Sequence, residues 1–184
     1  MIKYCHLLFL ALVLTALNKG VAQTMYKVSN GNILFKSDAT LEMIKATSAE
    51  LKGLFVPEKK QFAFKVKVTS FKGFNGPLQR EHFNENYLET NLYPDAAFEG
   101  KVIEDIDLNT NGTIIIRTKG NLTIHGVTQE RIIKSELTIK GKTILIKAEF
   151  SVLLEDHHIT IPKVVHEKLA SEIKVEIKAE MNAQ

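Results

Sequence analysis

The sequence contains few of the residues that cross-link a fold or interrupt its secondary structure. It contains one cysteine, four prolines and no tryptophan in 184 residues. A single cysteine excludes an internal disulfide framework, of the kind that small exported scaffolds need. A chain of this length can bury a sizeable core without one. We therefore expect one domain, stabilised by the burial of ordinary apolar side chains.

The sequence also lacks any block of like charge. It has 24 basic and 21 acidic residues, and two of the basic ones, Lys3 and Lys19, lie near the N-terminus, where the leader described next is expected. The rest of the chain is therefore nearly neutral. A nucleic-acid-binding surface needs clustered cations, so no nucleic-acid partner is expected.

The N-terminal segment has the pattern of a cleaved leader. Lys3 precedes the apolar run Leu7–Leu17, and the small residues Gly20-Val21-Ala22 follow it. This order is typical of a secretory signal peptide, and the apolar run is shorter than the roughly 20 residues that span a bilayer. The sequence predicts a signal peptide at residues 1–22 and an exported domain at residues 23–184. The mature protein is expected to be periplasmic or secreted, with no transmembrane segment.

Most of the mature chain alternates between apolar and polar residues, with the period of two that marks β-strands. We predict about eight strands: Thr24–Lys36, Leu51–Val56, Gln61–Ser70, a strand beginning at Ala96, Thr113–Ile124, Gln129–Lys140, Thr143–Leu154 and Glu172–Met181. The turn-forming cluster Ser29–Asn32 is expected to interrupt the first strand. Leu41–Thr47 is ambiguous and is assigned as helical if anything.

One stretch departs from this alternation. Apolar residues four apart predict a helix that begins near Gln79; the pairs are Phe83 with Tyr87 and Leu88 with Leu92. Pro94 ends it, because the residue before a proline avoids the α region. A second short helix is expected near Pro162. A helix within an all-β chain is expected to cap one end of a closed sheet.

Eight antiparallel strands that are each apolar on one face must bury those faces together. They can do so as a two-sheet sandwich or as a closed barrel. Closure removes the exposed edges, and eight strands leave room for side chains or for one slim ligand. Periodicity does not choose between these folds, nor between a filled and a hollow interior.

Two motifs point further. Residues 82–100 read HFNENYLETNLYPDAAFEG and residues 120–128 read GNLTIHGVT; together they resemble the YceI-like family. The resemblance implies an all-β fold, an extended eight-stranded antiparallel up-and-down barrel like that of the lipocalins, with short capping helices. It implies that a long apolar lipid chain, such as a polyisoprenoid, an isoprenoid quinone or a fatty acyl chain, is held in the lumen without catalysis, and it allows a homodimer. The chain departs from the family at Leu154–Ile159, which leaves the identity of the ligand open.

The candidate ligand-binding residues are the apolar ones expected to face the lumen: Phe62, Phe64, Phe83, Tyr87, Phe98, Ile116, Leu122, Ile124, Phe150, Val152 and Ile177. Phe83, Tyr87 and Phe98 fit a ligand tunnel and an ordinary plugged core equally well. The hydroxyl of Tyr87 is suited to meet a ligand head group at the mouth. The alternative function is a filled-core barrel that acts as a structural or protein-interaction module of the cell envelope.

The sequence contains no strong signal for a metal site or for catalysis. Five histidines lie beyond residue 22, but no two of them have the helical spacing of metal ligands, so no metal site is expected. His82 and His125 belong to the two motifs and are the pair expected to meet and to hold the helix to the barrel rim; the alternative is two unrelated rings that face solvent. No serine lies in a nucleophile-elbow pattern, and no spacing forces two carboxylates together. The sequence therefore predicts no catalytic residue and no cofactor.

Overall fold

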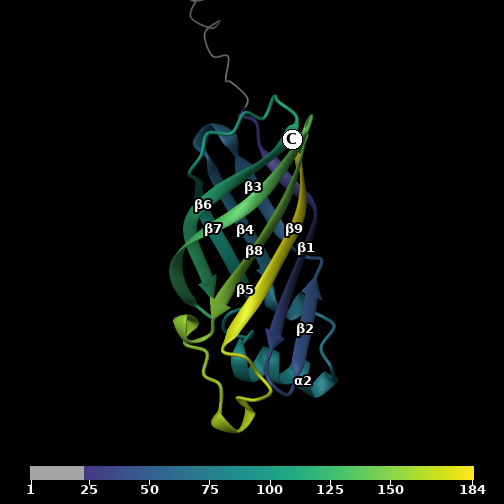
Figure 1. Cartoon of the computed structure of the whole chain (residues 1–184), viewed down its shortest axis with the longest axis vertical. Coiled ribbons are helices and arrows are strands. Elements are labelled where there is room, and N and C mark those ends of the chain that lie inside the picture. The colour runs from purple at the N-terminus through teal and green to yellow at the C-terminus, as the bar shows by residue number, and fades with distance from the viewer. Residues whose placement is uncertain (1–22) are drawn as a thin grey trace, which may run out of the picture.

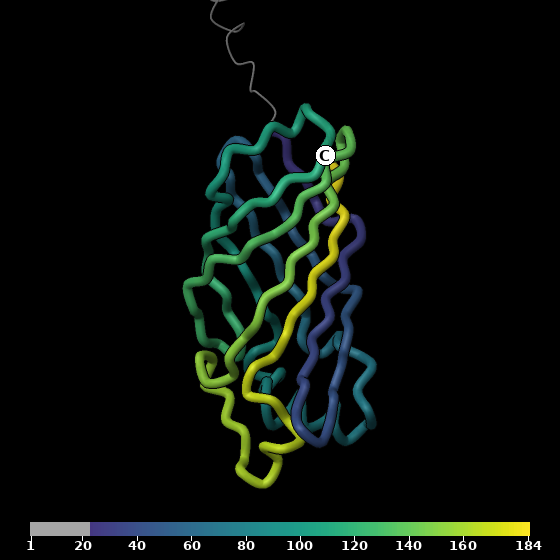
Figure 2. The backbone as a smooth tube through the Cα atoms, viewed as in Figure 1, coloured from purple at the N-terminus to yellow at the C-terminus, as the bar shows by residue number. Residues whose placement is uncertain are grey.

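The computed structural model describes residues 23–184, and the predicted leader lies outside them. Within these residues the chain forms nine strands that wind around one axis (Figures 1 and 2). The strands are β1 (Tyr26–Asp38), β2 (Met43–Ser48), β3 (Lys52–Val56), β4 (Gln61–Lys67), β5 (Asp95–Val102), β6 (Gly112–Ile124), β7 (Val127–Lys140), β8 (Thr143–Leu153) and β9 (Glu172–Ala183).

The helical segments are all short. They are the α-helix α2 (Pro77–His82), the π turn η3 (Phe83–Tyr87), and the 3-10 turns η1 (Pro57–Lys59), η2 (Val68–Ser70), η4 (Glu155–His157) and η5 (Lys163–Val165).

The sheet closes on itself through its first and last strands. β1 pairs antiparallel with β9 from Tyr26 opposite Ala183 to Ser37 opposite Ile173. β2 and β3 share the other edge of β1, β2 beside its second half and β3 beside its start. They therefore fill one position in the barrel, which has eight positions in all. The predicted eight-stranded antiparallel barrel is confirmed.

Side chains along each strand alternate between the inside and the outside of the barrel. In β9, Val175 and Ala179 are buried inside, whereas Lys174 and Glu176 are exposed. This is the consequence of the pleat, which points successive side chains to opposite faces of a sheet. The alternation read from the sequence thus separates inner from outer residues.

Two local predictions were wrong. The segment assigned as helical forms β2, in which Ile44 and Ala46 are buried and Lys45 is exposed. Pairing with β1 supplies the backbone hydrogen bonds that this short piece would otherwise lack. The cluster Ser29–Asn32 does not interrupt β1; the register shifts by one residue between Val28 and Asn30, so the strand continues through a bulge.

The capping helix is shorter than predicted. α2 ends at His82, and the backbone N–H of Leu88 then donates to the carbonyl of Phe83 at 3.0 Å, which widens the last turn to a π turn. Glu89 has a φ of 43° and reverses the chain. Leu92 is therefore exposed and does not share a buried helix face with Leu88.

The two ends of the barrel differ. At the end near the C-terminus, a tight cluster of buried side chains closes the interior; its members are Tyr26, Phe55, Phe62, Val102, Ile116, Leu137, Ile144 and Met181. The opposite end carries the β1–β2 loop, the α2 segment and the long β8–β9 connection (Figure 1). We call these the closed end and the open end.

Strands β5 and β6 approach each other closely at a pair of glycines. Gly100 lies directly opposite Gly120, and both face inward. A Cβ on Gly100 would lie 2.5 Å from the Cα of Gly120, and a Cβ on Gly120 would overlap the carbonyl oxygen of Glu99. The obstructing atoms belong to the backbone and cannot rotate away. Side chains are excluded here because the two strands approach too closely.

Replacement of Gly120 with Ala should therefore lower the free energy of unfolding by about 3 kcal/mol, the upper end of the usual overpacking range. Gly76→Ala is the control, since nothing lies within 4 Å of its Cβ position; it should lower the value by no more than about 1 kcal/mol. Urea denaturation of both variants measures the difference. Equal stability losses in the two would show that the close approach of β5 and β6 does not constrain the barrel.

Candidate functional site: an apolar cavity inside the barrel

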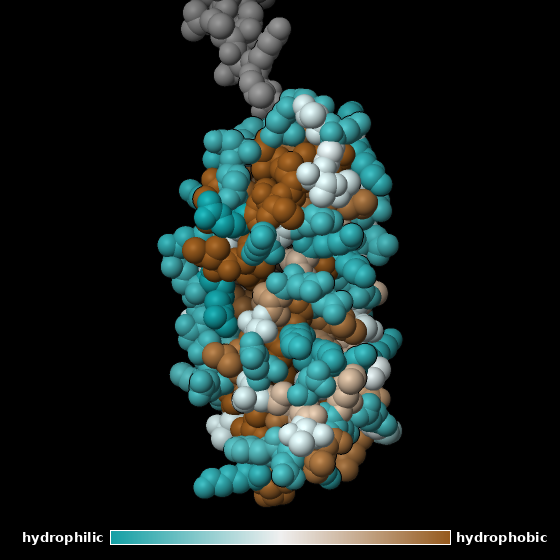
Figure 3. Space-filling view, in the orientation of Figure 1, coloured by the Kyte–Doolittle hydropathy of each residue, from teal (hydrophilic) through white to brown (hydrophobic). Residues whose placement is uncertain are grey.

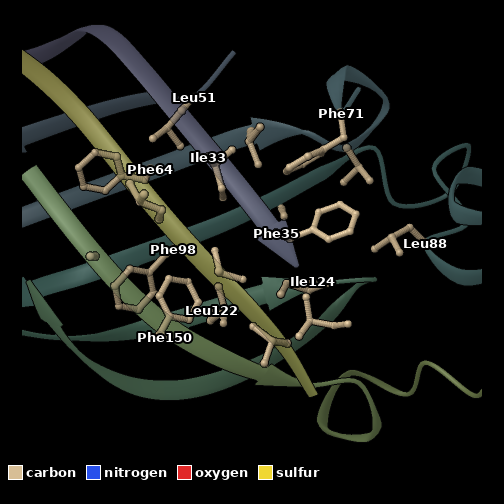
Figure 4. A pocket seen from close by; sticks show the side chains of 18 of the residues that line it. Ile33, Phe35, Leu51, Phe64, Phe71, Leu88, Phe98, Leu122, Ile124 and Phe150 are labelled. Atoms are coloured by element: carbon tan, nitrogen blue, oxygen red, sulfur yellow. The ribbon is translucent and has the colours of Figure 1, made fainter. Parts of the chain in front are cut away.

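The barrel encloses a cavity of about 670 Å³. Inward side chains from the strands line it, together with residues of the α2 segment and of the β8–β9 connection. Figure 4 shows aromatic and aliphatic side chains from opposite sides of the barrel pointing towards one shared space. The cavity is therefore a property of the whole barrel, and nearly all of its lining is apolar.

The pattern of burial shows that the interior is hollow. Inward side chains at the closed end, such as Ile144 and Met181, are almost fully buried. Those further along the axis keep exposed surface although they face inward; they include Ile33, Phe35, Phe64, Phe98, Phe150 and Ile177. Interiors of folded proteins normally pack without such gaps, so this surface is exposed to the cavity.

All eleven residues proposed from the sequence line this cavity. They come from β4, β5, β6, β8 and β9 and from η3, so the fold brings them together from distant parts of the chain. The sequence analysis missed further lining residues, among them Ile33, Phe35 and Phe71. The first two alternate within the predicted strand Thr24–Lys36, so the signal was present. Phe71 lies in an irregular segment, where periodicity gives no indication of direction.

Four phenylalanines anchor the capping segment at the open end. The ring of Phe83 stacks on Phe35 with a centroid separation of 5.2 Å and lies 5.0 Å from Phe74. Phe71 packs against Phe35 at 5.2 Å. Aromatic pairs at these separations stabilise packing beyond their area alone. Phe83 therefore belongs both to the cavity lining and to the contact that holds the helix.

Hydrogen bonds fasten α2 to the β1–β2 hairpin beside the cavity mouth. The side-chain amides of Asn75 and Gln79 both donate to Glu42 Oε1, at 2.9 and 3.1 Å. Asn75 Nδ2 also donates to the carbonyl of Met43 at 3.0 Å. Glu42, Asn75 and Gln79 all line the cavity. The mouth is thus polar, whereas the lumen behind it is apolar.

A second link joins the capping segment to the far side of the rim. His125 and Gly126 form the β6–β7 turn with positive φ values of 51° and 72°, the geometry of a two-residue hairpin turn. His125 Nδ1 donates to the carbonyl of His157 at 3.1 Å, and Nε2 lies 2.5 Å from Glu89 Oε2. The ring of Tyr93 packs edge-on against the imidazole at 4.8 Å.

The sequence analysis paired His125 with His82, but the structure gives His125 a different partner. His82 is exposed on α2 and lines the cavity mouth. Glu89 was missed because its role depends on the chain reversal after η3, which has no signature in the local sequence.

His157 is the buried ionisable group of this end. Its side chain is fully buried, and Nδ1 donates to the carbonyl of Val127 at 3.0 Å. The other ring nitrogen has no hydrogen-bond partner within the described part of the chain. Burial lowers the pKa of His157 below its ordinary value of 6.5, and the nearby charge of Arg131 lowers it further. Burial of this imidazole therefore favours its neutral form in the folded state.

Two further observations concern residues 23–184 alone. They contain no group of three His, Cys, Asp or Glu side chains placed to hold a metal ion. They also contain no helix long and apolar enough to cross a membrane.

A closed antiparallel barrel of eight positions around an apolar cavity is the architecture of the lipocalin-like fold class. The sequence matches the YceI-like domain model over residues 22–181. The chain therefore belongs to the YceI-like family, as the two motifs indicated.

Solved structures show the same fold. A polyisoprenoid binding domain from Saccharophagus degradans, implicated in plant cell wall breakdown, aligns with a TM-score of 0.74 and 12% identity, over 86% of this chain and 98% of that one. BcnA of Burkholderia cenocepacia aligns with a TM-score of 0.67 and 14% identity, over 82% and 95%. A Campylobacter jejuni YCEI protein aligns with a TM-score of 0.56 and 20% identity, over 71% and 78%. The comparison with curated proteins gives no match.

The neutral burial of His157 predicts a pH-dependent stability. Because the pKa of His157 is lower in the folded than in the unfolded state, the unfolded chain binds more protons than the folded chain as the pH falls below about 6.5. The contribution of His157 to the stability of the folded state is complete above that pH and is lost on acidification. The melting temperature of the wild type should fall more steeply between neutral pH and pH 5 than that of His157→Gln, which stays uncharged.

His158→Gln is the matched control, because His158 is adjacent but exposed; its melting temperatures should follow the wild-type pH profile. A wild-type profile no steeper than that of His157→Gln would contradict the assignment.

Proposed function

We propose that the protein binds a long apolar chain, such as a polyisoprenoid, an isoprenoid quinone or a fatty acyl chain, inside the barrel and does not catalyse a reaction. The observation that carries this proposal is the 670 Å³ cavity with its apolar lining. The structural similarity to a polyisoprenoid binding domain supports it. The eleven lining residues named from the sequence would contact the chain.

The shape of the cavity orients such a ligand. The packed cluster around Met181 blocks the closed end, so the apolar tail would enter through the open end and point towards the closed one. The polar end of the ligand would then remain at the mouth. Tyr87 and His82 line the cavity there, beside Gln79, and would offer a hydroxyl and an imidazole to a head group.

The size of the cavity is adequate for useful affinity. At about 30 Å³ for each water-sized group, it holds on the order of 20 such groups. Burial of each methylene contributes about 0.8 kcal/mol, hence roughly 15 kcal/mol before costs. Lost translational and rotational freedom costs about 4–15 kcal/mol. A net affinity therefore needs no charged anchor, provided that the chain fills most of the lumen.

The filled-core alternative requires a solid interior, and the cavity argues against it. We further propose that residues 1–22 direct export and that the mature protein acts in the periplasm or is secreted. A chain insoluble in water needs a carrier in such an aqueous compartment, because its burial removes the apolar surface from water.

Protein purified without delipidation should carry an elongated apolar molecule. Solvent extraction followed by mass spectrometry, and native mass spectrometry of the intact protein, would detect it. Protein stripped of lipid should then bind a fluorescent prenyl or acyl probe. A protein that is isolated empty and also binds neither probe would exclude the proposed function.

Narrowing the lumen should abolish this binding. Ala148 is buried, lines the cavity and lies opposite Ser135 and Ile177. Ala148→Phe places a ring where the ligand would pass, and it should weaken probe affinity about tenfold or more, or roughly 1.4 kcal/mol. Lys147→Phe is the control, since Lys147 is the adjacent residue and points outward; it should bind like the wild type.

Melting temperatures would confirm that both variants are folded. Unchanged affinity in a folded Ala148→Phe protein would show that the probe binds elsewhere.

A further inference from the structure

Three segments at the open end each expose a large apolar side chain. Leu41 in the β1–β2 loop is 65% exposed, Leu78 in α2 is 61% exposed, and Val164 in η5 is 88% exposed. Single exposed apolar residues are common on protein surfaces; these three differ in that they lie on neighbouring segments at one end of the barrel. Figure 3 shows apolar surface at the lower tip, which is the end that carries α2, as well as in the upper part of the barrel.

Hydrogen bonds tie these three segments to one another. The backbone N–H of Leu41 donates to the carbonyl of Glu167 at 2.7 Å, which joins the β1–β2 loop to the segment after η5. Gln79, the neighbour of Leu78, donates to Glu42, the neighbour of Leu41. The three segments that carry these exposed side chains therefore form one connected rim.

The same rim surrounds the mouth of the cavity. Five residues of these segments line the cavity: Glu42, Leu78, Gln79, Val165 and Lys168. Each of them is one of the exposed apolar tips, Leu41, Leu78 and Val164, or lies within four residues of one. The apolar tips thus lie beside the residues that line the cavity, and Leu78 belongs to both sets.

Charged residues flank the tips in the manner of a membrane-interfacial surface. Arg80, Lys163 and Lys168 lie on the same segments, together with the anions Glu42, Glu81 and Glu167. Long cationic side chains can keep their charges among lipid head groups while their stems lie beside apolar surface. Apolar tips that enter the boundary between head groups and acyl chains, with cations beside them, are the features by which peripheral proteins bind bilayers.

We propose that the open end docks on a lipid bilayer, with Leu41, Leu78 and Val164 inserted at the interface. The choice of a bilayer rests on the proposed function: a long apolar chain is dissolved in membranes, and a mouth seated on the bilayer lets it enter the lumen without crossing water. Cations and anions balance on these segments, three against three, so the apolar side chains carry the binding.

Flotation with vesicles of phosphatidylcholine and phosphatidylglycerol tests the docking, with a chain that begins at Gln23. The rim variant Leu41→Ser, Val164→Ser leaves Leu78 in place because Leu78 also lines the cavity. Its partition onto vesicles should fall about tenfold or more relative to the wild type. The matched control, Ile115→Ser, Ile132→Ser, removes two residues that are 53% and 62% exposed on the barrel wall and should float like the wild type.

A prenyl probe delivered from cyclodextrin separates this proposal from the proposed function. Both variants should bind it with wild-type affinity and melt at the wild-type temperature. Two results would overturn the docking proposal without affecting the proposed ligand binding in the lumen. One is wild-type protein that binds the probe but does not float; the other is a rim variant that floats like the wild type. Protein that floats but takes up no probe overturns the function and keeps the docking. Another outcome is that the rim substitutions convert a dimeric protein into a monomer without changing its flotation. That result would show that a second copy of the chain covers the rim, and it would overturn the proposal that a bilayer does.

Discussion

The pairing of β1 with β9 is the constraint on which the rest of the molecule depends. It joins the first and last strands from Tyr26 opposite Ala183 to Ser37 opposite Ile173, and it turns an open sheet into a tube. Closure satisfies the backbone groups that would otherwise line two free edges. It also directs one face of every strand towards a common axis. The cavity exists because the residues on that face are too few and too small to fill the space that closure creates.

The difference between the two ends follows from what each end buries. At the closed end, side chains such as Phe62, Ile144 and Met181 meet across the axis. At the open end the interior is covered by connections, which are fastened at Glu42 on one side of the rim and at His125 on the other. Connections fastened by a few hydrogen bonds move more readily than packed strands. The mouth of the lumen thus lies beside connections, whereas packed strand residues cover the other end.

Prediction from the sequence succeeded where the period of the side chains determines direction. Phe62, Phe64, Phe150 and Val152 were assigned to the lumen from alternation, and all four line the cavity. It failed where a partner from elsewhere decides the structure. The sequence of β2 is ambiguous, and its pairing with β1 makes it a strand. Glu89 has no local sign of a structural role, which it gains because the β6–β7 turn brings His125 beside it. The buried state of His157, next to the exposed His158, likewise has no local signature.

The sequence by itself determined that the chain is all-β, where most strands lie and which of their faces is apolar, because the pleat ties side-chain direction to residue number with a period of two. Its two motifs also indicated the family. Only the tertiary structure decided that the sheet closes through β1 and β9, that the lumen is hollow and open at one end, and that the segments carrying Leu41, Leu78 and Val164 lie at that end. Each of these depends on distances between residues far apart in the chain, and no local pattern records such distances.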